Sequence, residues 1–383
     1  MKRLRQIHTR KASVGNAPRY RRSPYLISYW VGPIAVIENY LTGEKVAAEG
    51  LVADLLSYSE KPRTVAEVCA EFPDTKAAVV QGVLRSLARC GLVEAVPPRG
   101  EKAGQRFNGW KAWSPSASYF HFSTKNVKYA RGEVEDFGRL RKLAAEIPLP
   151  TRKKTGSGVK TVVLSRARGG GEFVRVLEER RTWREFSAEP LELTQLEELL
   201  RLSFGVQGWA RIPGVGRLPL KTSPSGGALH PLEAYIAIRK VRGIERGIYR
   251  YDDERHRLEW VSRELGKKEL RRMLAGQDWF CDAAVIVFLT AVFPRTQWKY
   301  EHPRAYRVVL AEAGHVCQTF CLTATWLGLA PFCTMAFADS EIEKVLRVDG
   351  VEESLVYVMG AGARPGRAAT ADRLRLGGNS KHE

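Results

Sequence analysis

The sequence has few cysteines and no long apolar run. Its six cysteines are scattered over 383 residues and form no disulfide framework, so we expect reduced thiols in a cytoplasmic protein. Cys317 and Cys321 are four residues apart, but no further ligand stands at metal-binding spacing, and we expect no metal. No apolar run could cross a membrane, and the basic N-terminus lacks the apolar core of a secretory signal.

Acidic residues are also scarce, since 42 of them face 61 lysines and arginines, a net charge of +19. Nucleic acid is the usual partner of such an excess. The arginines, however, are spread through both halves of the chain. An acidic peptide or a phosphorylated cofactor would respond to the same field. No GxGxxG motif follows an early strand, so a dedicated NAD-binding domain is not expected.

A glycine pair stands at the centre of the stretch KTSPSGGALHPLEAY, residues 221–235. Ser223, Pro224 and Ser225 are turn residues. Gly226 and Gly227 lack a Cβ, so their backbone can bend sharply or lie against a flat ligand. The apolar run that follows Pro231 predicts a buried strand.

A second motif, RRTWREF, spans residues 180–186 and combines three arginines with a hydroxyl group. Guanidinium groups pair with phosphate oxygens, and a hydroxyl group adds one more hydrogen bond. Arg180, Arg181, Thr182 and Arg184 therefore suit a dianionic phosphate. A solvated run of charge is the alternative interpretation.

The third chemical motif is the pair Lys299-Tyr300, which precedes a long apolar pattern of helical spacing from Tyr306 to Leu329. A helix that is apolar around much of its circumference is buried on more than one side. Lysine acts as a general base where burial or a neighbouring positive charge lowers its pKa, and Arg295 and Arg304 are the nearby cations.

In this order, RRTWREF, PSGGALHPLE, the Lys-Tyr pair and TMAFAD resemble the SagB-type dehydrogenases, a branch of the FMN-dependent nitroreductase superfamily. The resemblance covers residues 119–367. It implies an α+β nitroreductase fold, with a central mixed sheet flanked by helices, and a homodimer with the long helix in its interface. It also implies Lys299 and Tyr300 as the catalytic pair. The implied FMN-binding residues are Arg180, Arg181, Thr182, Arg184, Ser223, Ser225, Gly226, Gly227, Met335, Ala336, Phe337 and one of Arg364 and Arg367.

In the N-terminal part, residue patterns predict two short strands within residues 24–40 and a strand at 92–96. They also predict three helices: one over 45–58, one that begins at the N-cap Thr64, and one over 76–90. This is a small winged-helix pattern. RTVAEVCAEF and VLRSLARCGLV resemble the PqqD-like peptide-recognition module, although DNA-binding winged helices share the pattern. We therefore predict a disordered tail over 1–23, a peptide-binding domain over 24–97, a linker and extended arm over 98–175, an FMN domain over 176–376 and a tail over 377–383.

Three functions fit these patterns. The resemblance implies oxidation of thiazoline or oxazoline rings in a precursor peptide, after a partner cyclodehydratase has made the rings. The second candidate function is that of a nitroreductase or flavin reductase that uses NAD(P)H. The Lys-Tyr pair argues against this function, because the relay of a hydride needs no such base. A nucleic-acid-binding winged-helix protein is the third, and only the net charge favours it.

Overall fold

The computed structural model describes residues 18–96, 110, 113–127, 133–147, 162, 164 and 169–366. The chain divides into two compact units, Met1–Thr124 and Lys125–Glu383, and each is described by itself. Among the described residues, no helix combines the length and the apolar character that crossing a membrane requires.

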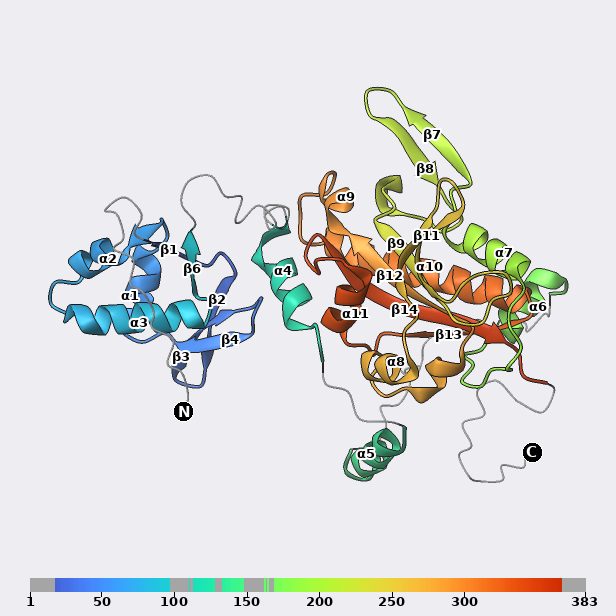
Figure 1. The fold of residues 1–383 in the computed structure, drawn as a ribbon, viewed down its shortest axis with the longest axis horizontal. Coiled ribbons are helices and arrows are strands. Elements are labelled where there is room, and N and C mark those ends of the chain that lie inside the picture. Colours follow the sequence, from blue (N-terminus) through green and yellow to red (C-terminus); the bar gives the residue numbers. More distant parts are fainter. Residues whose placement is uncertain are drawn as a thin grey trace, which may run out of the picture. The chain divides into compact units, whose positions relative to one another are not determined.

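The N-terminal unit holds two small antiparallel sheets and four helices (Figure 1). One sheet has the order β5-β1-β6 and the other β2-β3-β4. The strands are β1 (Arg19–Arg22), β2 (Leu26–Val31), β3 (Ile34–Asn39), β4 (Glu44–Ala47), β5 (Arg63–Thr64) and β6 (Val93–Val96). The helices are α1 (Leu51–Tyr58), α2 (Val65–Glu71), α3 (Ala77–Arg89) and α4 (Ser114–Ser123).

Most elements predicted for this unit are confirmed. The Thr64 hydroxyl accepts the Glu67 amide at 3.2 Å, and the Glu67 carboxylate accepts the Thr64 amide at 2.7 Å, which completes the predicted capping box. The helix expected over 45–58 is wrong in its first turn. There Val46 pairs with Ile37 in a sheet, and α1 begins only after Gly50.

Two boundary predictions for this unit are wrong. β1 lies inside the predicted tail because it fills the centre of a sheet between β5 and β6. The extended arm is partly the helix α4, which begins next to Pro115 and buries Phe122 against Tyr40. Aromatic packing therefore overrides the extended pattern of this stretch.

The second unit is built on a six-stranded sheet of order β11-β10-β9-β12-β14-β13. Its strands are β9 (Leu232–Ile238), β10 (Gly247–Asp252), β11 (Arg257–Arg263), β12 (Val285–Val292), β13 (Leu329–Thr334) and β14 (Glu353–Ala363). All neighbouring strands pair antiparallel, so the predicted mixed sheet is wrong. A four-residue turn joins β10 to β11, and such a short connection permits only antiparallel neighbours.

Helices cover both faces of this sheet. Phe332 belongs to the buried cluster beneath α8 (Lys267–Met273) and α11 (Asp339–Leu346). The next residue, Cys333, faces α10 (Ala305–Trp326), because side chains alternate along a strand. Helix α7 (Leu193–Phe204) packs on α10, and α6 (Glu172–Glu179) lies against it as well. The predicted long helix is thus confirmed.

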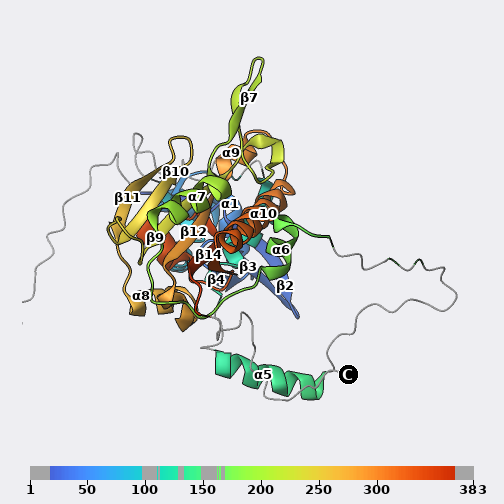
Figure 2. The same ribbon diagram turned by 90° about the vertical axis from the view of Figure 1, so that its right-hand side faces the viewer.

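Three further stretches have regular structure. The hairpin of β7 (Gly208–Ile212) and β8 (Gly216–Leu220) projects from its unit in both views (Figures 1 and 2). Helix α5 (Glu133–Glu146) lies in the predicted linker and extended arm, of which residues 98–109, 111, 112, 128–132, 148–161, 163 and 165–168 lie outside the described residues. β14 continues through Ala363 because Gly360 sits between Ile286 and Phe332 in the ladders.

Candidate active site

The predicted glycine surface forms a strained turn just before β9. Gly226, Gly227 and Ala228 make one 3-10 turn, η3, in which Gly227 has φ +69° and Ala228 has φ +54°. The Ser225 hydroxyl accepts the His230 amide at 2.9 Å and closes the turn. Left-handed backbone costs energy at non-glycine residues, and clusters of it are found at functional sites. The turn therefore holds its shape through contacts around it.

The predicted catalytic pair follows the central strand β12. Phe293 and Pro294 open the short helix α9 (Phe293–Gln297) at the strand's end, and Pro suits a first helical turn. The amide of Tyr300 donates to the Thr296 carbonyl at 3.0 Å, so the helical turn carries on to the pair. A rigid core strand thus positions Lys299 and Tyr300.

The structure brings the pair and the glycine turn together. A methyl group on Gly227 would lie 2.9 Å from Nζ of Lys299 and 2.9 Å from Oη of Tyr300. A methyl group on Gly226 would lie 2.7 Å from Cγ1 of Val308 on α10. An added methyl group at either position would therefore push these side-chain ends away, and φ +69° also favours glycine at position 227. Lys299 is exposed, and its Nζ lies 5.3 Å from the centre of the Tyr300 ring.

Two buried side chains beneath the turn were not assigned from the sequence. Burial raises the pKa of Glu312 to about 6, although its carboxylate accepts hydrogen bonds from the Ser225 hydroxyl and the Gly226 amide. Burial lowers the pKa of His230 to about 4, so the ring is neutral at pH 7 and its 3.9 Å approach to Glu312 is no ion pair. Glu312 on a helix looks like a solvated charge in the sequence, and no periodic pattern distinguishes it.

A cavity of about 450 Å³ opens beside the turn. Its size is that of an ordinary small-molecule pocket. The turn lines it with Ser225 and Gly226, and α10 lines it with Val308, Ala311, Glu312 and His315 together with the exposed cations Arg304 and Arg307. The Arg295 guanidinium does not line this cavity and donates to the His230 carbonyl at 3.0 Å and to the Glu233 carboxylate at 2.5 Å.

The arginine motif lies against the C-terminal end of α10. The Arg364 guanidinium donates to the carbonyls of Thr325 and Leu329, at 3.2 and 3.0 Å, and lies over the Trp183 ring. Arg181 donates to the carbonyls of Glu178 and Arg180, both at 2.7 Å. These cations thus neutralise the ends of α6 and α10.

The other residues of the motif run along the sheet edge. The Trp183 amide donates to the Pro331 carbonyl at 2.9 Å, which joins the motif to β13. Thr182 is half-buried beside it. Arg184 is exposed and lies 5.7 Å from the centre of the Trp279 ring. The motif is therefore joined to β13, and its Arg181 and Arg184 side chains are exposed.

The remaining candidates are Ser223, Arg367 and the three residues that follow β13 in the sequence. Met335 is exposed, Ala336 is half-buried, and the Phe337 side chain is buried in the core beneath the sheet. Ser223 bonds to the Thr319 hydroxyl at 2.7 Å on α10. Arg367 lies outside the described residues.

The glycine turn and Arg364 contact opposite ends of α10. The glycine turn contacts Val308 near its start, and Arg364 contacts Thr325 near its end. These two helix positions lie about 25 Å apart, given a rise of about 1.5 Å per residue.

Comparison with known proteins identifies the second unit. The profile of the nitroreductase family matches residues 177–363. MJ1384 of Methanocaldococcus jannaschii, a protein named after that family, is 36% identical over 173 residues, which cover 45% of this chain and 83% of MJ1384. The residues that the profile matches include the arginine motif and the glycine turn.

Two further relatives are named for the processing of trifolitoxin and of microcin B17. The trifolitoxin-processing protein TfxB of Rhizobium leguminosarum bv. trifolii is 33% identical over 140 residues, 35% of this chain and 37% of TfxB. The microcin B17-processing protein McbC of Escherichia coli is 30% identical over 171 residues, 42% of this chain and 57% of McbC. The matches thus span about a third of one relative and just over half of the other. By its match to the profile and to most of MJ1384, the chain belongs to the nitroreductase family.

Proposed function

We propose that the chain is an FMN-dependent dehydrogenase that oxidises thiazoline or oxazoline rings of a precursor peptide to thiazoles or oxazoles. The observation that carries the proposal is the contact of Lys299 and Tyr300 with the Gly227 turn. A base and a hydroxyl group held against a flat glycine surface suit proton removal from a planar ring. The names of TfxB and McbC, both processing proteins of peptide products, point to the same substrate class.

The residues fit FMN if two copies of the chain contribute. Arg180, Arg181 and Arg184 suit the phosphate, and the Gly226–Gly227 surface suits the flat ring system. The α10 positions that the glycine turn and Arg364 contact lie about 25 Å apart, which favours a site shared between two subunits. We therefore propose a homodimer in which the arginines of one subunit face the glycine turn of the other.

An exposed apolar surface supports this dimer. Phe173 and Leu177 on α6 and Trp326 on α10 are exposed to 70%, 44% and 42%. Phe173 and Trp326 line one groove of about 260 Å³ together with Leu202 and Leu322. Exposed apolar patches of this kind mark interaction surfaces. A second copy of α10 and its neighbours is the occupant that we propose.

In the proposed reaction the ring loses two hydrogens. Lys299, with Tyr300 beside it, takes the proton from the ring α-carbon. FMN supplies the acceptor for the electron pair and the second hydrogen, and dioxygen is the final oxidant. Glu312 positions the turn by accepting from Ser225 and Gly226 and so keeps Gly227 against the pair.

The N-terminal unit is the proposed binding site for the leader part of the precursor. Trp30, Val31 and Ile34 surround the β2–β3 turn and are exposed to 72%, 56% and 47%. β2 and β4 are edge strands that accept an added strand through main-chain hydrogen bonds. The net charge of +19 favours an acidic leader. A cyclodehydratase that makes the rings is the expected partner enzyme.

Purified full-length protein tests this function. It should be yellow, release FMN on denaturation, and in air without NAD(P)H remove two hydrogens per ring from a cyclised precursor, as read by mass spectrometry. The relationship to MJ1384 makes NAD(P)H-dependent reduction of nitroarenes the competing activity. Reduction of a nitroarene with no change in peptide mass would replace the proposal by that activity.

A further inference from the structure

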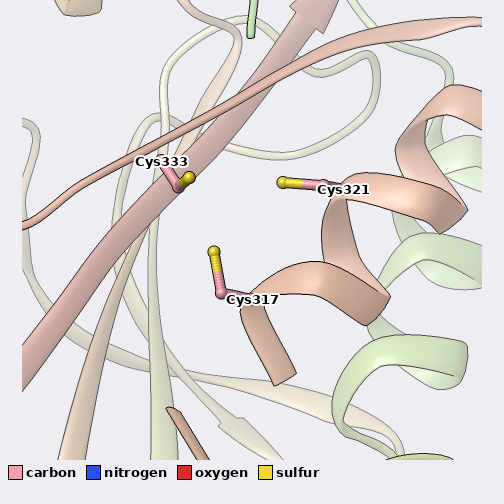
Figure 3. A group of neighbouring side chains, drawn as sticks. All are labelled: Cys317, Cys321 and Cys333. Carbon is pink, nitrogen blue, oxygen red and sulfur yellow. The ribbon is translucent and has the colours of Figure 1, made fainter. Parts of the chain in front are cut away.

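Three cysteine thiols meet between α10 and β13. Figure 3 shows the sulfurs of Cys317, Cys321 and Cys333 pointing toward one another, the first two from the helix and the third from the strand. All three sulfurs lie within 4.8 Å of one another. The spacing of four residues puts the helix pair on one face, and the antiparallel return of β13 brings the third thiol opposite. Sequence reasoning missed this third ligand because it lies on a different element.

The donor set of this cluster is sulfur alone. Among the residues that the structure describes, no histidine or carboxylate joins the three thiols within ligand distance. Thiolate ligands select Cu(I), Zn²⁺ and iron–sulfur clusters. Structural zinc sites have four protein ligands, and clusters have four cysteines as a rule. Sulfurs within 4.8 Å of one another also leave no room between them for the inorganic sulfide of a cluster.

The three thiols differ in their access to solvent. Cys317 and Cys321 are only 4% and 3% exposed, whereas Cys333 is half-buried. A cation thus has one accessible sulfur at which to enter and two buried ones that exclude water as a fourth ligand.

We propose that Cys317, Cys321 and Cys333 form a binding site for one Cu(I) ion, a soft monovalent cation, in a trigonal set of three thiolates. Binding releases the protons of those thiols that are still protonated, so no oxidant or reductant is needed. The site joins α10 to β13, and it is separate from the glycine turn and the Lys-Tyr pair. It therefore adds to the proposed dehydrogenase function and does not depend on it.

The test is a titration of the full-length, fully reduced protein with Cu(I) under anaerobic conditions, in competition with the chromogenic chelator bicinchoninate. Wild-type protein should withhold one equivalent of copper from the chelator. Cys333→Ser and Cys317→Ala should each withhold none. Cys281→Ser is the matched control, because Cys281 is buried in the same unit and stands outside the cluster. It should behave as wild type.

Two readouts decide the outcome. Circular dichroism shows that each variant is folded, and X-ray absorption of the copper-loaded protein should show sulfur neighbours only. Equal copper retention by wild type and folded Cys333→Ser would overturn the site. So would tighter binding of Zn²⁺ than of Cu(I), with oxygen or nitrogen in its first shell, because that outcome requires a fourth ligand.

Discussion

The two ends of α10 make different kinds of contact. At its start, the Gly227 turn and the Lys299-Tyr300 pair are in contact with each other, and a single added methyl group would separate them. At its end, Arg181 and Arg364 are paired with backbone carbonyls of helix ends. Under the proposed function, the first end carries the chemistry, whereas the second supplies positive charge for the FMN phosphate.

This difference supports separate roles for the glycine turn and the arginine motif in the proposed function. Close packing around glycine fixes geometry, which chemistry at a ring carbon requires. Guanidinium groups on carbonyls stay charged and exchange partners at modest cost, which suits the binding of a phosphate. Disturbing the first end should impair turnover, and disturbing the second should impair cofactor affinity.

The largest effect is expected from Gly227→Ala. The new methyl group would meet both Lys299 and Tyr300 at 2.9 Å and displace them, so ring oxidation should fall at least about a hundredfold, the scale of general-base catalysis. Flavin content should be measured in the same samples and should fall as well, because the Gly226–Gly227 surface is also proposed to hold the flat ring system of FMN. Gly214→Ala is the matched control, with φ +74° but open space around the added methyl group. Equal losses in both variants would mean that backbone strain, not the lost contact, matters.

Arg181→Ala and Arg184→Ala should weaken FMN binding at the other end of α10. Loss of a charge-assisted phosphate contact costs about 1.5–3 kcal/mol, or one to two decades in affinity. Flavin titration by fluorescence quenching measures it. Arg211→Ala on the β7–β8 hairpin serves as a control for the loss of one exposed charge. Wild-type flavin affinity in both motif variants would remove them from the phosphate site.

Mixing two defective proteins tests whether the two ends meet across a dimer. Lys299→Ala and the double variant Arg181→Ala/Arg184→Ala should each be inactive at limiting FMN. After subunit exchange, activity should recover to about a quarter of wild type, because half of the dimers are mixed and half of their sites are intact. A mixture that stays as inactive as its parts would place both ends in one subunit's site.

The smallest expected effect is on the pH dependence of stability. Burial lowers the pKa of His230 to about 4 from 6.5, so its contribution is present above pH 6.5 and is lost as the pH falls toward 4. Burial of Glu312, with a pKa of about 6 against 4.5, opposes this below pH 6. His230→Asn, which tolerates φ +41°, should therefore lose less stability than wild type between pH 6.5 and 4.

Urea unfolding at several pH values measures that difference. His256→Asn is the matched control, since His256 also has a left-handed backbone, with φ +49°, but bonds to Tyr251 near the surface. It should keep the wild-type pH profile. An identical profile for His230→Asn would show that His230 titrates normally.

Sequence patterns correctly predicted those features that depend mainly on residues close together in the chain. The capping box at Thr64, the strand β9 and the helix α10 follow from periodicity and turn chemistry, and the structure confirms them. The order of the motifs led to the family. Direct contact between the glycine turn and the Lys-Tyr pair, about seventy residues apart, is visible only in the structure.

The sequence did not predict those features of the structure that tertiary packing determines. Strand β12 pairs with β9 and β14, which are distant in the sequence, and the direction of such pairs depends on tertiary packing, so the predicted mixed sheet was wrong. Helix α4 forms because Phe122 packs on Tyr40, and the third thiol joins its cluster from another element. Buried Glu312 has no signature, because acidic residues on helices are usually solvated.

The most direct test of the central claim compares wild type with Lys299→Ala on one cyclised precursor. Mass spectrometry follows the loss of two hydrogens per ring, and absorbance reports bound flavin in the same samples. Wild type should convert the rings, and Lys299→Ala should stay yellow and folded yet act at least about a hundredfold more slowly. Lys268→Ala, an exposed lysine on α8, should match wild type. Near-normal ring oxidation by flavin-loaded Lys299→Ala would contradict the account.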